Sequence, residues 1–152
     1  MLALLLAFAL PCWHRRYLVC LDLDAHRYAS VLSQVQSDHF MSVEYIIVGG
    51  ATAGEGAVVT RNRTVVADLW QLAPPTRWFL VETNYDHWMP PPADDNRRDP
   101  ANRRMNATGS AAIGADAMFG LLSDFPNLNA ETTYTTVMSA TTGQYFSVTR
   151  NL

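Results

Sequence analysis

The side chains best suited to chemistry lie in one short stretch, Glu82-Thr83-Asn84-Tyr85-Asp86-His87-Trp88, and in the pair Arg97-Arg98 that follows it. The Asn84 amide can donate two hydrogen bonds, and the Arg97 guanidinium is a permanent cation with a planar fork of donors. Both groups can stabilise negative charge that develops on an oxygen atom during a reaction. These residue types therefore favour chemistry that passes through an oxyanion.

The loop around Asn84 has a composition that can hold side chains rigidly. A predicted strand, Arg77 to Thr83, ends directly before Asn84, and three consecutive prolines begin at Pro90. A stiff loop at a strand end can present polar groups to a cleft. There is a second interpretation: Asn84 and Asp86 form an Asx-type turn, and Arg97 and Arg98 pair with Asp94 and Asp95 at the surface. Composition alone favours this second interpretation.

Three helices are predicted around this stretch. Apolar residues at three- and four-residue spacing predict a helix from Asp22 to Gln36. A second helix is expected to start with Asp99 as its N-cap and Pro100 at the first helical position, and to end at Gly109. The third is predicted from Asp116 to Asp124.

Strands make up the rest of the expected framework. Runs rich in β-branched and aromatic residues, bounded by turn residues, predict them. They are Val43 to Val48, Gly56 to Arg61, Thr64 to Trp70, Arg77 to Thr83, Thr132 to Ser139 and Gln144 to Arg150. Antiparallel strands in succession, with helices before and after them, belong to the α+β class.

Length and composition exclude several kinds of protein. The chain has 152 residues, of which 49% are hydrophobic and 16% charged, so one domain with a buried core is expected rather than a disordered chain. The net charge of −3 gives no reason to expect nucleic acid as a partner. All 11 basic residues are arginine. The absence of lysine excludes Schiff-base catalysis, a Walker-type phosphate loop and a serine–lysine dyad.

Neither cofactor nor metal is expected. Two cysteines, Cys12 and Cys20, cannot form a disulfide framework or a four-ligand zinc site. The 4 histidines are scattered without metal-ligand spacing, so surface or structural roles are expected for them.

The amino terminus is expected to be a separate segment, residues 1–21, before a main domain at residues 22–152. Met1 to Leu10 is an apolar run of about half the length that a helix needs to cross a bilayer. It fits the core of a secretory signal peptide, a buried helix or a sequence that starts within a gene. The basic group Trp13 to Arg16 is expected in a solvated turn.

Several motifs together resemble a known family. They are EYIIVGG at Glu44 to Gly50, EGAVVTRNR at Glu55 to Arg63, VETNYDHW at Val81 to Trp88, DDNRRDPA at Asp94 to Ala101, MNATG at Met105 to Gly109 and TTYTTVMSA at Thr132 to Ala140. In this order, the region from Tyr28 to Arg150 resembles the β-subunit of the N-acylethanolamine-hydrolyzing acid amidases and their relatives, the acid ceramidases.

The resemblance implies both a fold and a reaction. The fold is the C-terminal part of an N-terminal-nucleophile hydrolase, an αββα sandwich of antiparallel sheets, here incomplete. Such enzymes hydrolyse linear fatty-acyl amides in the acidic lysosome, using a cysteine that the precursor exposes by cutting itself. By resemblance, Asn84 is the oxyanion-stabilising asparagine and Arg97 the active-site arginine, against the surface-pair interpretation. Asn96 stands where the family tends to have aspartate, which is expected to alter a local charge pair but not the chemistry.

The resemblance also implies partners. The family's nucleophile opens a Cys-Thr-Ser segment that is followed by an arginine and an aspartate, and neither Cys12 nor Cys20 is followed by that pattern. Cys20 is instead expected to be a buried core thiol. The nucleophile is therefore expected on an α-subunit-like segment, with a lipid amide as substrate and peripheral contact with a membrane. The alternatives are an inactive truncated fragment or interaction remnant, and hydrolysis of ceramides.

Two sequons accompany the expected secretory route. Asn62-Arg63-Thr64 and Asn106-Ala107-Thr108 have the N-glycosylation pattern. Asn106 falls where the family carries a sequon, so it is the better candidate of the two.

Overall fold

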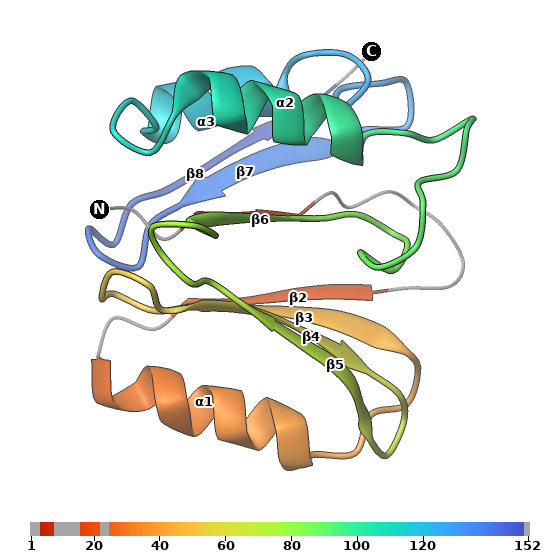
Figure 1. The fold of residues 1–152 in the computed structure, drawn as a ribbon, viewed down its shortest axis with the longest axis vertical. Helices are drawn as coiled ribbons and strands as arrows, with labels where there is room; N and C mark the ends of the chain where they lie inside the picture. Colours follow the sequence, from red (N-terminus) through yellow and green to blue (C-terminus); the bar gives the residue numbers. More distant parts are fainter. Residues whose placement is uncertain (1–3, 8–15, 22–24, 151–152) are drawn as a thin grey trace.

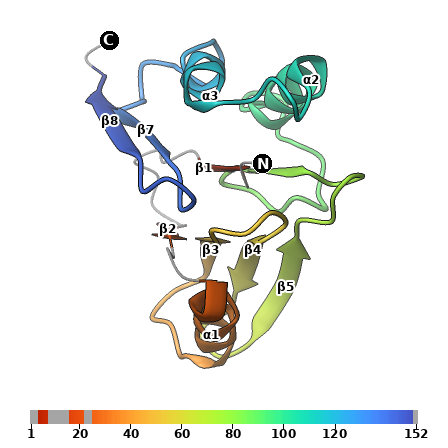
Figure 2. The same ribbon diagram turned by 90° about the vertical axis from the view of Figure 1, so that its left-hand side faces the viewer.

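The protein is built in four layers. The computed structural model describes residues 4–7, 16–21 and 25–150, with side chains described from residue 28 onward. In this part of the chain one helix lies on the outer face of a first sheet, a second layer of strands packs on the inner face, and two helices cover that layer (Figures 1 and 2). The predicted α+β class and αββα layering are confirmed.

The first sheet has four strands in the order β2-β3-β4-β5. Their bounds are Arg16–Leu21, Glu44–Gly49, Gly56–Arg61 and Val66–Gln71. The last three are antiparallel to one another, which confirms the predicted framework. Cross-strand registry places Tyr45, Thr60 and Asp68 in one row and Ile47, Val58 and Trp70 in another. Side chains in such a row point to one face, so both rows face the second layer of strands.

Helix α1, Ala25–Ser37, covers the other face of this sheet. Its Leu32 and Val35 pack against Ile46, Val48 and Val59. The helix predicted from Asp22 to Gln36 is thus confirmed, although its expected start lies outside the described residues. Strands β3 and β4 are buried from Tyr45 to Gly49 and from Gly56 to Arg61, because the helix covers one face of the sheet and the second layer covers the other.

Arg61, which is completely buried, caps the C-terminal end of α1. Its guanidinium donates one hydrogen bond to the Gln36 carbonyl oxygen and another, of 2.5 Å, to that of Asp38. It also lies 5.2 Å from the centre of the Phe40 ring. Carbonyl groups at a helix end have no partner within the helix, and a cation suits the negative end of the helix dipole.

The second layer consists of two strand pairs. β6, Phe79–Glu82, pairs with β1, Leu4–Ala7, and β7, Tyr134–Met138, pairs with β8, Tyr145–Thr149. Helix α2, Arg98–Thr108, packs on β6, and α3, Ala115–Leu122, packs on β7 (Figure 1). The core between them is formed by Val81, Ala101, Met105, Met118, Leu121 and Val137. Leu80, the neighbour of Val81, packs toward the first sheet instead, so β6 is buried on both faces.

The strand directions and the amino terminus differ from the sequence expectations. β1 runs parallel to β6 and β2 parallel to β3, so the sheets are not wholly antiparallel. Leu4–Ala7 is a strand, which contradicts the buried-helix interpretation of Met1 to Leu10. Arg16 opens a strand rather than lying in a turn, while Trp13 lies outside the described residues. A leucine-rich run has helical propensity, but pairing with a strand already in place overrides it.

The start of α2 also differs. The helix has Arg97 as its N-cap, so the predicted N-cap role of Asp99 is wrong. Asp99 and Pro100 lie inside the first turn, where the missing N–H of proline costs nothing because that turn has no intrahelical acceptor for it. Gly109 ends the helix as predicted, with φ of 74°, in the region that glycine adopts most readily.

Replacing Arg61 tests whether it caps the C-terminal end of α1. Arg61→Met keeps the approximate length of the side chain but removes a buried cation and its hydrogen bonds to the carbonyl groups of Gln36 and Asp38, so the free energy of unfolding should fall by about 3 kcal/mol. Equilibrium urea denaturation of the full chain measures this. Arg63→Met, at an exposed turn position, is the matched control and should change stability little. Equal losses in both variants would contradict the role of Arg61.

Candidate functional site

The structure brings Asn84 and Arg97 together. Asn84 directly follows the short segment after β6, and Arg97 is the residue on which α2 begins. The Arg97 Nη2 group donates a hydrogen bond to Asn84 Oδ1 across a separation of 13 residues. The two residues singled out from the sequence therefore form one constellation, at the junction of β6 and α2.

Asp95 holds the Arg97 guanidinium in place. Arg97 Nε lies 2.6 Å from Asp95 Oδ1, and Nη2 lies 2.9 Å from Oδ2. The surface-pair interpretation anticipated a partner of this kind, but Arg97 is only 1% exposed. A buried guanidinium in a two-point contact with a carboxylate has a fixed orientation, which an exposed pair lacks.

The contact with Arg97 fixes the orientation of the Asn84 amide. An amide has one acceptor oxygen and one donor NH₂ group, and arginine can only donate. Because Oδ1 faces Arg97, Nδ2 must point away from it, and it has no acceptor among the described residues. The Asn84 Nδ2 group thus has a fixed direction and N–H donors that are available to a ligand, which is the arrangement that stabilises an oxyanion.

Asn96 fixes the backbone on which Arg97 lies. Its Oδ1 accepts a hydrogen bond of 3.1 Å from the Asp99 backbone N–H, and its Nδ2 donates one of 2.8 Å to the Asp99 carboxylate. This reciprocal contact satisfies one free donor of the first turn. An aspartate at position 96 could accept but not donate, and would face the Asp99 carboxylate as a like charge. Asn96 therefore makes hydrogen bonds with Asp99 where an aspartate would bring two carboxylates together.

Arg98 clamps the loop that carries Asn84. Its Nη1 donates a hydrogen bond of 3.1 Å to the Asp86 carbonyl oxygen, and its Nη2 donates to that of Met89. Its guanidinium also lies 4.9 Å from the centre of the Tyr85 ring. The interpretation in which Arg98 pairs with an aspartate at the surface is thus wrong, because its guanidinium contacts two backbone carbonyl groups and an aromatic ring.

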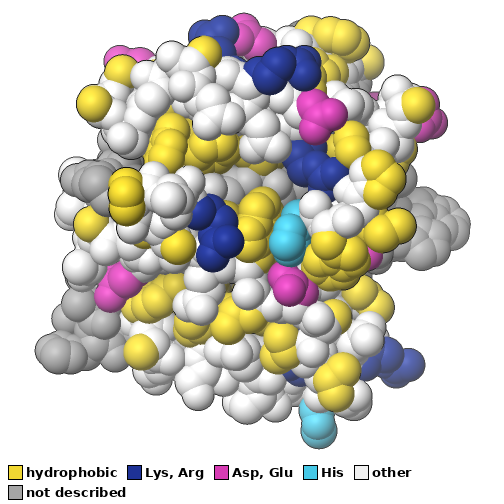
Figure 3. Space-filling model, in the orientation of Figure 1, with side chains coloured by type: hydrophobic (Ala, Val, Ile, Leu, Met, Phe, Trp, Pro, Cys, Tyr) yellow, Lys and Arg dark blue, Asp and Glu magenta, His cyan; other side chains and the backbone are white. Residues whose placement is uncertain are grey.

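His87 lies in a second contact between this loop and the first sheet. Its Nε2 is 2.9 Å from Asp68 Oδ2, and its ring stacks on that of Trp70 at 4.0 Å with an interplanar angle of 6°. Trp88, on its other side, is 49% exposed. Figure 3 shows hydrophobic side chains gathered across the middle of one face, next to charged and histidine side chains. Pairing of His87 with Asp68 agrees with the structural role expected for the histidines.

The described part of the chain contains neither a metal-binding cluster nor a membrane-spanning helix. Among the described residues no group of three or more His, Cys, Asp or Glu side chains could hold a metal ion. No described helix has the length and apolarity needed to span a bilayer.

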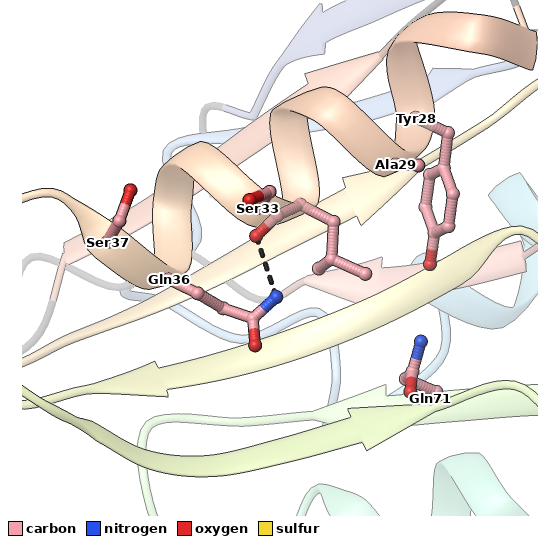
Figure 4. A pocket seen from close by; sticks show the side chains of 7 residues that line it. Tyr28, Ala29, Ser33, Gln36, Ser37 and Gln71 are labelled. Atoms are coloured by element: carbon pink, nitrogen blue, oxygen red, sulfur yellow. Dashed lines mark hydrogen bonds between the residues drawn. The ribbon is translucent and has the colours of Figure 1, made fainter.

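A groove of about 550 Å³ lies elsewhere, between α1 and the edge of the first sheet (Figure 4). Tyr28, Leu32 and Gln36 line it from the helix and Gln71 from β5. Burial raises the pKa of the Tyr28 hydroxyl above its ordinary value, although a hydrogen bond with Gln71 opposes this. The hydroxyl therefore stays neutral in acidic and neutral solution. Because Leu32 packs on the face of the sheet away from Tyr45, the groove is not part of the Asn84 site.

The chain is similar to several known proteins, although no family model matches its sequence. The chain is 54% identical to the N-acylethanolamine-hydrolyzing acid amidase of Cavia porcellus over 110 residues, which are 71% of this chain and 31% of that protein. It is 44% identical to the protein of the same name from Oryctolagus cuniculus over 130 residues, 84% of this chain and 36% of that one. It is also 42% identical to acid ceramidase of Homo sapiens over 108 residues, 70% of this chain and 27% of that protein.

A solved structure gives the same relationship. It is that of the Caenorhabditis elegans N-acylethanolamine-hydrolyzing acid amidase ortholog, with a TM-score of 0.66 and 34% identity. The match covers 75% of this chain and 48% of that chain. The chain thus spans about a third of the length of the curated relatives it matches, and about half of the solved one.

Replacing Asn96 tests the local support of the site. Asn96→Ala removes the acceptor for the Asp99 N–H, so the free energy of unfolding should fall by about 1 kcal/mol, the usual value of a helix cap. Thermal unfolding followed by circular dichroism measures it. Asn102→Ala, inside the same helix and without a hydrogen bond in the described structure, is the control and should keep the wild-type midpoint. A midpoint of Asn96→Ala equal to that of the control would rule out the cap.

Proposed function

Because this chain belongs to the family of N-acylethanolamine-hydrolyzing acid amidase and acid ceramidase, we propose that it forms part of an enzyme that hydrolyses fatty-acyl amides. The single observation that carries the proposal is the contact between Arg97 and Asn84 Oδ1, which leaves Asn84 Nδ2 as a directed donor. A fixed donor beside a buried cation suits the reaction of an amide carbonyl better than it suits a structural turn.

Asn84 acts at the step in which the carbonyl becomes tetrahedral. A thiolate nucleophile attacks the amide carbon, and the electron pair of the C=O bond moves onto the oxygen. Asn84 Nδ2 donates a hydrogen bond to that oxygen, whose charge is greatest in the transition state. The intermediate then collapses, the C–N bond breaks and the amine leaves with a proton. Water releases the fatty acid from the sulfur in the second half of the reaction.

Arg97 contributes through orientation and charge. Its hydrogen bond to Asn84 Oδ1 keeps the amide from rotating, because the opposite orientation would place two donors against each other. Its positive charge, partly balanced by Asp95, also polarises the amide and strengthens Nδ2 as a donor. Asn84 is therefore the catalytic residue of this half of the site, and Arg97 its immediate partner.

The nucleophile comes from a second segment of polypeptide in this proposal. The spacing after Cys12 and Cys20 does not fit the expected motif, and the structure does not describe either side chain. The relatives are about three times as long as the matched region, so they contain the chain length that such a segment needs. The proposal thus includes two partners, an α-subunit-like segment that supplies the nucleophile and a lipid amide that is the substrate.

The amide of an ethanolamine is the preferred substrate. The two amidases compared above are 54% and 44% identical to this chain, against 42% for human acid ceramidase. By resemblance, His87 and the proline-rich loop also favour the amidase. The names of both relatives contain the word acid, which fits work in the acidic lysosome. Peripheral contact with a membrane is part of the proposal because the substrate is a lipid. Ceramide is the second candidate substrate.

Replacing Asn84 tests this function. In the enzyme assembled with its nucleophile-bearing segment, Asn84→Ala should lower kcat about 100-fold, the usual effect of losing one oxyanion donor, with KM nearly unchanged. Hydrolysis of a fluorogenic fatty amide at acidic pH measures both constants. Asn102→Ala is the control and should keep the wild-type kcat. A normal kcat in Asn84→Ala would remove Asn84 from the mechanism.

The two sequons give an independent test of the secretory route. Asn62 lies at the exposed turn between β4 and β5, and Asn106 on the exposed side of α2, so both are accessible to a glycan. When the chain is expressed with a secretory leader in mammalian cells, each of Asn62→Gln and Asn106→Gln should remove one glycan. Mobility before and after treatment with an N-glycosidase measures this. If mobility of the wild-type chain does not change on treatment, neither site is used.

A further inference from the structure

The loop that carries Asn84, residues 84–89, is held at Asp86 from two sides. Tyr45 on β3 donates a hydrogen bond of 2.6 Å from its hydroxyl to Asp86 Oδ1. Arg98 at the start of α2 donates one of 3.1 Å to the Asp86 carbonyl oxygen. The side chain of Asp86 is thus tied to the first sheet and its backbone to the helix above.

Tyr45 is a rigid anchor for this contact. It is completely buried, and it lies on β3, which is paired with a strand on each side. Its neighbours on the same face, Ile47 and Val58, pack around it. A hydrogen bond from a hydroxyl to a carboxylate is short and strong, and little water competes for the buried Tyr45 side of this one.

The neighbouring contact between His87 and Asp68 cannot replace this anchor. The side chains of those two residues are 20% and 34% exposed, so solvent screens their interaction. Tyr45 and Asp86 are 41 positions apart in the sequence, so their hydrogen bond ties the loop to β3 in the first sheet.

Asp86 in turn sets the path of the backbone next to Asn84. Its carbonyl oxygen accepts a hydrogen bond from the Met89 N–H at 3.0 Å as well as from Arg98, which closes a turn. Asp86 is only two residues from Asn84, so a movement of the Asn84 backbone would also displace Asp86 and strain its hydrogen bond with Tyr45. A donor misplaced by even about 1 Å loses much of its effect on a transition state.

We propose that Tyr45 is a positioning residue for this site: its hydroxyl holds Asp86, and Asp86 holds the backbone that aims Asn84 Nδ2. The catalytic consequence rests on the function proposed above. Tyr45 touches no reacting atom in this scheme, so its removal should affect the rate of the chemical step and the mobility of one loop, and leave substrate affinity unchanged.

Tyr45→Phe tests the proposal because it removes only the hydroxyl. Hydrogen–deuterium exchange of the full chain should become faster in residues 84–89 alone, by about tenfold, the factor that corresponds to losing one hydrogen bond to a charged group. In the assembled enzyme kcat should fall by a similar factor, with KM within about twofold of wild type. Tyr134→Phe, on an exposed position of β7, is the matched control and should change neither measurement.

Substitutions at Asp86 separate positioning from general packing. Asp86→Asn keeps an oxygen that accepts from Tyr45 and should retain most of the rate. Asp86→Ala should resemble Tyr45→Phe, and the double variant Tyr45→Phe/Asp86→Ala should be no slower than either single variant, because all three lack the same contact.

Three results would overturn the proposal. They are wild-type exchange in residues 84–89 of Tyr45→Phe, faster exchange spread over the whole chain, and additive losses in the double variant. If the assembled wild-type enzyme hydrolyses no amide, the proposed function fails on its own. The exchange experiment still decides then whether Tyr45 holds the loop, because it needs no substrate.

Discussion

A buried guanidinium is the constraint on which the site depends. Arg97 is almost wholly removed from water, and a charge in that position must be paired and hydrogen-bonded. Asp95 supplies the charge, and Asn84 supplies a neutral oxygen. Because arginine has no acceptor, it dictates which end of the Asn84 amide faces it. The direction of the remaining donor therefore follows from the electrostatics of burial, before any substrate is present.

The layered fold explains how this arrangement is supported. Asn84 leaves a strand of the second layer, and its loop passes between α2 on one side and the first sheet on the other (Figure 1). Arg97 and Arg98 act from the helix, while Tyr45 and Asp68 act from the sheet. A loop held from both layers can keep a polar group aimed at one point, as a preorganised site requires. The start of α2 is part of the site, because Arg97 and Arg98 contact Asn84 and its loop from there.

Sequence patterns predicted the elements better than their contacts. Apolar spacing identified α1, and β-branched runs identified β3 to β8, because these patterns reflect burial. β1 and β2 were not predicted as strands, because their residues were assigned to an apolar segment and a turn, and their parallel direction has no local signal either. Residue type singled out Asn84 and Arg97, but composition favoured a surface role for them, and the resemblance to a family favoured the catalytic one. Tyr45 was missed because its hydrogen bond to Asp86 depends on how the two layers stack. Nothing in the sequence around Tyr45 distinguishes it from an ordinary core residue of a strand.

The structure of the assembled protein with an electrophilic fatty-acyl analogue bound to its nucleophile would show where Asn84 points when the oxyanion is present. Asn84 Nδ2 should lie about 2.7–3.1 Å from the oxygen that carries the negative charge. Asn84 Oδ1 should keep its contact with Arg97 Nη2. An Asn84 side chain turned away from that oxygen, or an Arg97 that no longer touches Asn84, would contradict the role proposed for Asn84.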